Sequence, residues 1–312
     1  MSVSDLRSDP QFLELLIRVG SDFTLTQGFG GNASYKSNGK MMVKSSGMKL
    51  GDVDSANYFY EVEVSNGEYK EPGFSQQGKP SIEVFLHAML PQKYVVHLHS
   101  VKGVALSMLM VNNGVLQEEL KKLQVSMVPY QRPGIELKNA IKEIYSHSLS
   151  DGFLLKNHGT LFGADSVDQL SKRIHQFEEA VSAMVGQGLN LSLSPAHLDT
   201  DLDFEAASHF LWHAQTNWRI SPDHVVFLGS SAPKELIQVL TKPCSIRQVL
   251  KAVFPTREEI GPHQEQLLWF MNVVQYLPLQ PLSTLTEDDA NNLINWDAEK
   301  HRLRLAENQN FN

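Results

Sequence analysis

Two Asn-Gly pairs, at residues 38–39 and 66–67, constrain the fold of this chain more than any other local feature. Asn and Gly both tolerate the positive φ angle that a tight hairpin turn requires. Each pair separates two strand-like runs, in "SYKSNGKMMVK" and in "YFYEVEVSNGEYK". An amphipathic helix is expected before them, over residues 10–20. The N-terminal part of the chain therefore predicts one helix followed by antiparallel hairpins.

Helical and strand-like segments alternate over the residues that follow. A short helix is expected in "KPSIEVFLHAML", with Ser81 as its N-cap and Glu83 in its first turn. A buried strand is expected in "KYVVHLHS", and a strand pair with a turn at residues 157–159 in "GFLLKNHGTLFG". A long amphipathic helix is expected over residues 167–185. The pattern indicates an α/β domain.

A stretch rich in Gly, Ser, Asn and Pro, "GQGLNLSLSPAHLDTD", indicates a linker. We place the domain boundary there and expect two domains, residues 1–190 and residues 191–312. The second combines a strand predicted in "HVVFLG" with several helices, and the last helix is expected to begin at Thr286. This helix-rich α/β region carries no recognisable chemical motif. Its His209 and His213 lack the glutamate of an HExxH site, so a structural role is expected for both.

Charge and cysteine content exclude several classes of partner and site. A net charge of -8 without a basic cluster argues against nucleic acid as a partner. Cys244 is the only cysteine, so an internal disulfide and a cysteine-rich zinc site are excluded, and a metal would be held by His, Asp or Glu. No apolar window reaches the roughly 20 residues that cross a membrane, and the first residues do not read as a secretory signal. A cytoplasmic protein is expected.

Three histidines favour a metal site. His97 and His99 lie two positions apart on a predicted strand, so their side chains project to the same side and could bind one ion. This spacing alone leaves open that two histidines merely share a strand. His158 lies at a turn after an apolar strand, where a functional side chain can be presented, although a turn histidine can also simply be solvated. Three imidazoles plus water form an open catalytic zinc arrangement.

Five motifs resemble the class II aldolase and adducin family in order and spacing. They are "GFGGNAS", "VKSSGMKLGDV", "PSIE", "VVHLHS" and "LLKNHGTLFG", and the resemblance covers about residues 8–190. Members of the family include fuculose-phosphate aldolase, rhamnulose-phosphate aldolase, ribulose-phosphate 4-epimerase and methylthioribulose-phosphate dehydratase. The resemblance implies a three-layer αβα fold with a central, mostly antiparallel sheet. It also implies a homo-oligomer, usually a tetramer with active sites at the subunit interfaces.

The resemblance further implies roles for individual residues. His97, His99 and His158 would hold a divalent ion, usually Zn²⁺, and Glu83 would be the catalytic carboxylate. A carboxylate beside a Lewis-acidic ion can take a proton while the ion stabilises the enediolate that forms. Considered alone, Glu83 could also have only a structural role, because the helix dipole favours an acidic residue in the first turn of a helix. The glycine-rich loops would bind the substrate phosphate through Asn32, Ser46, Gly47 and Ser81.

Two positions depart from the sugar-phosphate aldolases of the family. Ile82 stands where a hydroxyl residue usually precedes the catalytic glutamate, so one expected phosphate contact is missing. Those aldolases also take a proton-donating tyrosine from a neighbouring subunit, in the segment soon after the HxH strand, and residues 107–124 contain no tyrosine. Tyr130 matches a different family position and is the remaining candidate for this acid.

The function implied is that of a metal-dependent lyase, which cleaves a small sugar or sugar phosphate by a reversible aldol reaction through a metal-stabilised enediolate. A dehydratase, epimerase or decarboxylase acting on a related sugar acid or sugar phosphate is the alternative. Glu83 disfavours the epimerase, which usually carries Asp there, whereas the missing tyrosine disfavours a standard aldolase. A non-catalytic, adducin-like binding protein is the third possibility, although adducin lacks the metal histidines that are present here.

Overall fold

The computed structural model describes residues 9–70, 78–109, 114–147, 150–186, 188, 191, 195–256 and 261–308. The chain forms two compact units, Met1–Met184 and Val185–Asn312. The first eight residues, where no secretory signal is expected, and residues 189–190, beside the predicted domain boundary, lie outside the described part. The division at residue 190 therefore stays a prediction. No helix among the described residues is long and apolar enough to cross a membrane.

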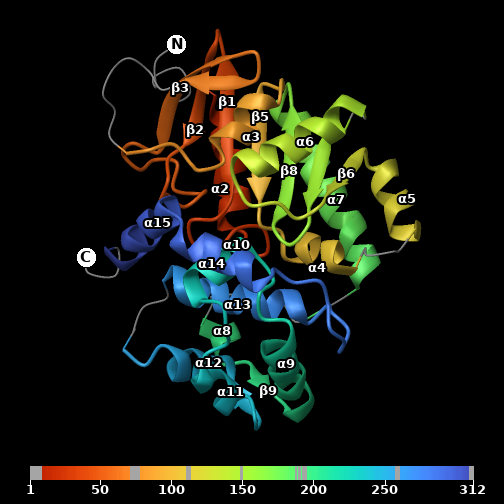
Figure 1. Cartoon of the computed structure of the whole chain (residues 1–312), viewed down its shortest axis with the longest axis vertical. Helices are drawn as coiled ribbons and strands as arrows, with labels where there is room; N and C mark the ends of the chain where they lie inside the picture. The colour runs from red at the N-terminus through yellow and green to blue at the C-terminus, as the bar shows by residue number, and fades with distance from the viewer. Residues whose placement is uncertain are drawn as a thin grey trace. The chain divides into compact units, whose positions relative to one another are not determined.

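An eight-stranded sheet forms the centre of the first unit (Figure 1). Its strands are β1 (Asn32–Ser37), β2 (Lys40–Lys44), β3 (Phe59–Ser65), β4 (Glu68–Lys70), β5 (Tyr94–Leu98), β6 (Val125–Val128), β7 (Gly152–Leu155) and β8 (Gly159–Ala164). They lie in the order β4-β3-β2-β1-β5-β8-β7-β6. Neighbouring strands pair antiparallel, apart from β6 and β7, which are parallel. The predicted, mostly antiparallel sheet is confirmed.

Two helices, α3 (Val84–Met89) and α6 (Ile135–His147), cover one face of the sheet. They pack with the strands around an apolar core, and each fully buried side chain of this kind stabilises the fold by roughly 1.5–3 kcal/mol. The buried residues of this core are Leu86, Leu90, Val95, Val128, Leu137, Ile141, Phe153, Leu155 and Leu161. A further helix of this unit, α5 (Gly114–Lys122), packs beside β6.

The opposite face is covered by other helices. They are α2 (Pro10–Ser21), α4 (Val101–Leu109) and α7 (Val167–Val185). The rings of Phe162 in β8 and Phe177 in α7 have centroids 5.4 Å apart, and those of Phe12 in α2 and Tyr94 in β5 have centroids 4.9 Å apart. Consecutive strand residues point to opposite faces, so Tyr94 lies on this side and Val95 on the other. The three-layer arrangement predicted from the sequence is confirmed.

Both Asn-Gly pairs form the hairpin turns that the sequence predicts. In the first, Asn38 and Gly39 have φ angles of 50° and 75° and connect β1 to β2. In the second, Asn66 and Gly67 have φ angles of 53° and 76° and connect β3 to β4. Positive φ at both central residues matches the twist of the flanking strands, which is why Asn-Gly is favoured there.

The second unit is mainly helical. Its described helices are α8 (Pro195–Leu198), α9 (Phe204–Thr216), α10 (Pro222–Leu228), α11 (Lys234–Val239), α12 (Ile246–Val253), α13 (Pro262–Val274), α14 (Glu287–Asn295) and α15 (Asp297–Asn308). A two-stranded sheet joins β9 (Asp201–Leu202) to β10 (Cys244–Ser245). Thr286 caps α14, as predicted, because its side chain accepts the backbone N–H of Asp289. A further helix, α15, then follows it.

The strand predicted in "HVVFLG" is wrong, because its first five residues belong to α10 and Gly229 is the C-cap of that helix. The Ser221 side chain accepts the N–H of His224, and Pro222 occupies the first turn, where its missing N–H costs nothing. These start signals outweigh the strand preference of the β-branched pair Val225 and Val226.

His209 and His213, on α9, each lie within hydrogen-bond distance of a backbone carbonyl of the second unit. His213 is fully buried, and its Nε2 lies 3.3 Å from the carbonyl oxygen of Leu277. Burial, followed by the neighbouring His209, lowers the pKa of His213 to about 4. The Nε2 of His209 lies 2.9 Å from the carbonyl oxygen of Val274. Both imidazoles therefore connect α9 to the C-terminal end of α13, at Val274, and to the residues that follow it, at Leu277. The structural role expected from the sequence is confirmed.

Candidate metal centre

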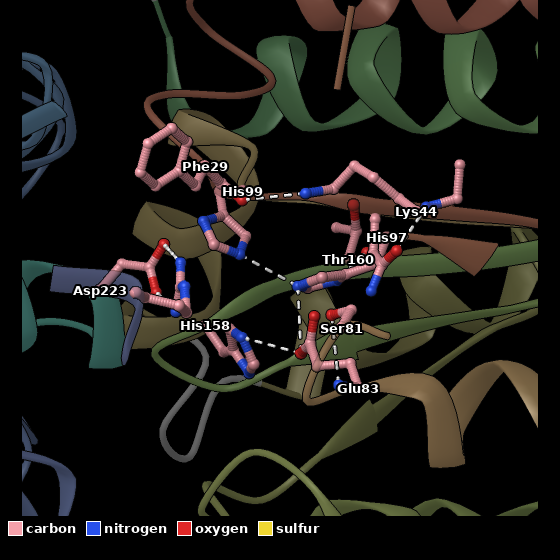
Figure 2. Close-up of polar contacts among 12 residues, drawn as sticks. Phe29, Lys44, Ser81, Glu83, His97, His99, His158, Thr160 and Asp223 are labelled. Atoms are coloured by element: carbon pink, nitrogen blue, oxygen red, sulfur yellow. Dashed lines mark hydrogen bonds and ion pairs between the residues drawn. The ribbon is translucent and has the colours of Figure 1, made fainter. Parts of the chain in front are cut away.

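Three histidines converge where β5 and β8 lie side by side (Figure 2). His97 belongs to β5 and His99 follows that strand directly, whereas His158 lies in the turn between β7 and β8. The antiparallel pairing of Leu98 with Thr160 brings that turn beside the end of β5. At the turn, Asn157 has a φ of 57°, a left-handed conformation that Asn tolerates well. The sheet, not the sequence order, therefore brings His158 to the other two.

The geometry of the three imidazoles fits a small divalent cation. Each ring offers one nitrogen, and these atoms all lie within 4.8 Å of one another. The Nε2 atoms of His97 and His99 are 3.1 Å apart. Two nitrogens that bind one zinc ion tetrahedrally are about 3.3–3.4 Å apart, because each Zn–N bond is about 2.0–2.1 Å long. All three residues are at most 5% exposed, so such an ion would be largely shielded from water.

The hydrogen bond behind His97 fixes which of its nitrogens can bind an ion. Its Nδ1 lies 2.8 Å from the carbonyl oxygen of Thr160. A carbonyl only accepts hydrogen bonds, so Nδ1 carries the proton and Nε2 presents its lone pair to His99. Metal-binding histidines usually donate their second N–H to a backbone carbonyl or carboxylate in this way. The contact with Thr160, which sequence patterns did not indicate, is therefore typical of a metal site.

Glu83 places a carboxylate beside the histidines, and it is 6% exposed. Its Oε1 lies 3.5 Å from Nε2 of His97 and 3.3 Å from Nε2 of His158. Figure 2 shows this carboxylate pointing toward the two rings. The prediction of Ser81 as the N-cap is wrong, because α3 begins at Val84 and Glu83 is the N-cap residue. Ser81 instead accepts the Glu83 N–H through its Oγ, at 3.3 Å, and forms the preceding turn.

The other predicted substrate contacts lie on three segments, at the start of β1, after β2 and before α3. Asn32, at the start of β1, is fully buried and lies opposite His97 in the register of β1 and β5. Ser46 and Gly47 follow β2, and Gly47 has a left-handed φ of 79°. The N–H of Ser46 is used internally, because it donates to the carbonyl of Lys79 at 2.9 Å. An isolated bridge between Ser45 and Pro80 brings this loop to the segment that contains Ser81.

Tyr130 follows β6, in the loop before α6, and is half-buried. Its role as the acid of the reaction stays a prediction.

Lys44 is a residue of this region that the sequence analysis missed. It ends β2 and is 2% exposed, and its Nζ donates to the carbonyls of Phe29 and Met48. A lysine at the end of an apolar run normally reads as a solvated charge, since lysine is almost never fully buried. The sequence carries one signal, which is that Lys44 lies inside the family motif "VKSSGMKLGDV".

Gly30 packs directly against a candidate metal ligand. A Cβ atom at Gly30 would lie 2.5 Å from Nδ1 of His99 and 2.9 Å from the carbonyl oxygen of Gln27, closer than any normal contact. We therefore expect Gly30→Ala to displace the His99 ring and to weaken metal affinity by roughly tenfold or more, as other losses of support behind a metal ligand do. Competition with a chromophoric chelator measures this change.

The matched control is Gly114→Ala, because a Cβ at Gly114 would meet nothing within 4 Å. If both variants bound metal as tightly as the unchanged protein, the position of His99 would not depend on Gly30.

Glu178, on α7, is a half-buried residue whose carboxyl group lies beside Ser100, two residues after the end of β5. Its Oε1 is buried, and the group forms a hydrogen bond with Ser100, the residue after His99. Burial raises the pKa of Glu178 from 4.5 to about 7, and Asp22 adds to the rise while Ser100 opposes it. The folded protein therefore keeps this proton over a pH range in which the unfolded chain loses it.

This shift predicts a pH-dependent stability. Between pH 4.5 and about 7 the folded state binds more protons than the unfolded state, so the free energy of unfolding falls as the pH rises. The contribution of Glu178 to this fall is at most about 3 kcal/mol. Urea unfolding of the unchanged protein and of Glu178→Gln at both ends of this range measures it, because glutamine does not titrate. An equal stability difference between the two proteins at both pH values would contradict the prediction.

Comparisons with known proteins place the chain in a family. The sequence model of the "Class II Aldolase and Adducin N-terminal domain" matches residues 14–185. A 3-oxo-tetronate 4-phosphate decarboxylase of Escherichia coli O6:H1 is 29% identical over 195 residues, which cover 57% of this chain and 88% of that protein. The uncharacterized oxidoreductase YuxG of Bacillus subtilis is 28% identical over 190 residues, or 52% of this chain. The match spans only 27% of the length of YuxG.

A solved structure gives a similar match. It is the N-terminal class II aldolase domain of a conserved protein from Thermoplasma acidophilum, 24% identical, covering 56% of this chain and 92% of that one with a TM-score of 0.47. The family match spans more than half of the 312 residues and includes every candidate site residue described above. The chain therefore belongs to the class II aldolase and adducin N-terminal domain family.

Proposed function

We propose that the protein is a metal-dependent lyase that cleaves or forms a carbon-carbon bond next to a carbonyl group in a small sugar or sugar phosphate, by a reversible aldol reaction. The observation that carries this proposal is the position of Glu83, whose Oε1 lies 3.3–3.5 Å from two of the three converging imidazoles. A buried carboxylate at this distance from a cation site can move a proton on a substrate held there.

Each residue of the site has a proposed part in this chemistry. His97, His99 and His158 would hold a divalent cation, and zinc is the ion we expect. When bound, such a cation supplies Lewis acidity that stabilises negative charge on a carbonyl or hydroxyl oxygen of the substrate. Glu83 would take a proton from, or return it to, the carbon beside the substrate carbonyl. Asn32, Ser46, Gly47 and Ser81 would hold the anionic end of the substrate.

Decarboxylation is a second candidate, supported by the similarity to 3-oxo-tetronate 4-phosphate decarboxylase along 88% of that protein. Loss of CO₂ from a 3-oxo acid breaks a carbon-carbon bond and leaves the electron pair on the carbon next to the carbonyl. Glu83 would then deliver the proton that this carbon requires. The proposed residues are the same for both reactions, because each leaves negative charge beside a carbonyl.

One screen separates these reactions. The purified protein, grown in metal-replete medium, is analysed for bound metals and then tested against ketose phosphates, unphosphorylated ketoses and phosphorylated 3-oxo acids. Aldehyde release indicates the aldol reaction, and CO₂ release indicates decarboxylation. We expect close to one equivalent of a divalent transition metal. Less than about a tenth of an equivalent would contradict the enzyme proposal and favour a non-catalytic binding protein, because three-histidine sites in metalloenzymes hold their ion tightly.

A further inference from the structure

His87 is a fully buried polar residue on α3, the helix whose N-cap is Glu83. The other buried residues of this helix, Val84, Leu86 and Ala88, are apolar and belong to two core clusters. A leucine at residue 87 would fill a similar volume without losing the hydration that an imidazole has in water. The presence of a histidine therefore indicates that the polarity of its ring is used.

The hydrogen bond of this imidazole leads to β1. Its Nδ1 lies 2.8 Å from Oγ of Ser34, which is also fully buried. Its Nε2 is buried and has no hydrogen-bond partner among the residues that the structure describes. Burial, followed by the charge of nearby Lys36, lowers the pKa of His87 well below its usual 6.5, so the ring is neutral at pH 7. The contact with Ser34 is therefore the polar connection that this residue makes between α3 and the sheet.

Both ends of this connection lie next to residues of the candidate site. On the helix side, the carbonyl oxygen of Glu83 accepts the backbone N–H of His87 at 3.4 Å. On the strand side, Ser34 lies two residues after Asn32, whose partner in β5 is His97. Alternate residues of a strand share a face, so Ser34 points to the same side of the sheet as Asn32. The hydrogen bond thus joins the strand beside His97 to the helix that presents Glu83.

The helix α3 is too short to hold Glu83 in place by itself. It has six residues, and isolated helices shorter than about 12 residues are marginally stable in water. Apolar packing stabilises such a helix but is non-directional, so it restrains rotation about the helix axis less strictly than a hydrogen bond does. A hydrogen bond requires a defined distance and angle. The contact with Ser34 can therefore fix how α3 is rotated, and with it where the Glu83 carboxylate points.

We propose that His87 and Ser34 are positioning residues, which fix α3 on the sheet and thereby hold the carboxylate of Glu83 against the three histidines. This inference rests on the proposed function. Oε1 of Glu83 lies 3.3–3.5 Å from two of the imidazoles. Reacting groups must be held within about 0.5 Å of their productive geometry, so a small rotation of α3 is enough to impair proton transfer. In this role both residues act through Glu83 and not on the substrate itself.

The first test replaces each partner of the hydrogen bond. His87→Leu and Ser34→Ala each leave a buried polar group without its partner, which lowers stability, and each removes the directional contact. With the metal-loaded proteins and the best substrate of the screen, we expect kcat to fall roughly 10- to 100-fold while KM changes by less than about threefold. The metal content should be retained. The midpoint of thermal unfolding should fall by roughly 2–10 °C.

The double variant Ser34→Ala/His87→Leu separates positioning from loss of stability. Replacing both partners by apolar side chains removes the unpaired polar group, so most of the lost stability should return. The directional contact is still missing, so kcat should stay as low as in His87→Leu. Recovery of kcat together with stability would overturn the proposal.

His87→Asn is the conservative variant. An asparagine side chain has an amide oxygen or nitrogen in the place of Nδ1 and no atom in the place of Nε2, so it can keep the contact with Ser34. This variant should keep kcat within about threefold of the unchanged protein, although its smaller side chain lowers stability. A kcat as low as that of His87→Leu would contradict the role assigned to the Nδ1 contact.

The matched control for Ser34→Ala is Ser126→Ala. Ser126 also lies on a strand of the sheet, β6, and its hydroxyl also contacts a side chain, since its Oγ lies 2.5 Å from that of Ser150. Its replacement should leave kcat within about threefold of the unchanged protein. A loss in Ser126→Ala equal to that in Ser34→Ala would show that any lost hydroxyl contact of the sheet impairs the reaction, which would overturn the proposal.

A second cycle tests whether His87 acts through Glu83. In a Glu83→Gln background, His87→Leu should lower the remaining kcat by less than about threefold, because the carboxylate that it positions is absent. A further loss of 10-fold or more would show that His87 acts on another group.

Amide hydrogen exchange tests the positioning without a substrate. In His87→Leu the backbone amides of α3 should exchange at least roughly fivefold faster than in the unchanged protein, and in His87→Asn they should not. Equal exchange in His87→Leu and the unchanged protein would overturn the inference. Absence of bound metal and of turnover in the unchanged protein would instead contradict the proposed function, and exchange would still decide whether Ser34 holds this helix.

Discussion

Replacing Glu83 by glutamine is expected to lower kcat by roughly 100- to 10,000-fold, the range in which a positioned acid or base contributes to catalysis. Glutamine has nearly the same shape but cannot take a proton. Because His97, His99 and His158 remain, we expect the variant to keep its metal. The rate is measured on the best substrate from the screen, and the metal content is measured on the same preparation.

The control for Glu83→Gln is Glu61→Gln. Glu61 is also 6% exposed, but it lies on β3 and pairs with Nζ of Lys40 at 2.7 Å, outside the candidate site. Its replacement should leave kcat within about threefold of the unchanged protein, because Glu61 lies on a different strand from the candidate site residues and the loss of its ion pair with Lys40 affects stability. If Glu83→Gln retained full activity, the proton transfer would have to be assigned to another group.

Replacing His158 by glutamine is the second change with a large expected effect. It removes one of three imidazoles from a site whose nitrogens lie within 4.8 Å of one another. We expect bound metal to fall from about one equivalent to less than a tenth, and activity to fall by about a thousandfold or more, because the ion supplies several kcal/mol of charge stabilisation. Elemental analysis and the substrate assay measure the two effects.

His175→Gln serves as the control for His158→Gln. His175 lies on α7, its side chain is 72% exposed, and it faces Glu179 on the same helix. This variant should keep both metal and activity. A full equivalent of metal in His158→Gln would show that His158 is not a ligand, and the site would then have to be formed without it.

Hairpins and strands of the first unit were predictable because their signals are local. The Asn-Gly turns at residues 38–39 and 66–67 require a positive φ that few other residues adopt, and the structure has it at all four positions. The convergence of His158 with the two histidines of the HxH strand was predicted through family motifs. The spacing of these histidines in the sequence could not predict their convergence, because it depends on the pairing of β5 with β8.

Other features depend on contacts that a local pattern does not contain. The strand predicted at His224 is a helix because Ser221 and Pro222 set its start, whereas the β-branched residues suggested a strand. The N-cap residue of α3 is Glu83 and not the predicted Ser81. The Ser81 hydroxyl instead accepts the Glu83 N–H in the turn before the helix. Lys44 was missed because one of its acceptors, the carbonyl of Phe29, belongs to the loop before β1, a different strand from its own.

The sheet order has a consequence for how the chain folds. β5 pairs on one side with β1, where His97 lies opposite Asn32, and on the other with β8, where it lies opposite Leu161. Asn32 and His97 are 65 positions apart and His97 and Leu161 are 64 apart, and closing such long loops costs chain entropy before any contact repays it. Hairpins such as β1-β2 can form early, whereas His97 and His158 meet only after the most distant strands have paired. A cation at this site would therefore stabilise only states in which β5 and β8 have paired, and would discriminate them from intermediates that contain hairpins alone.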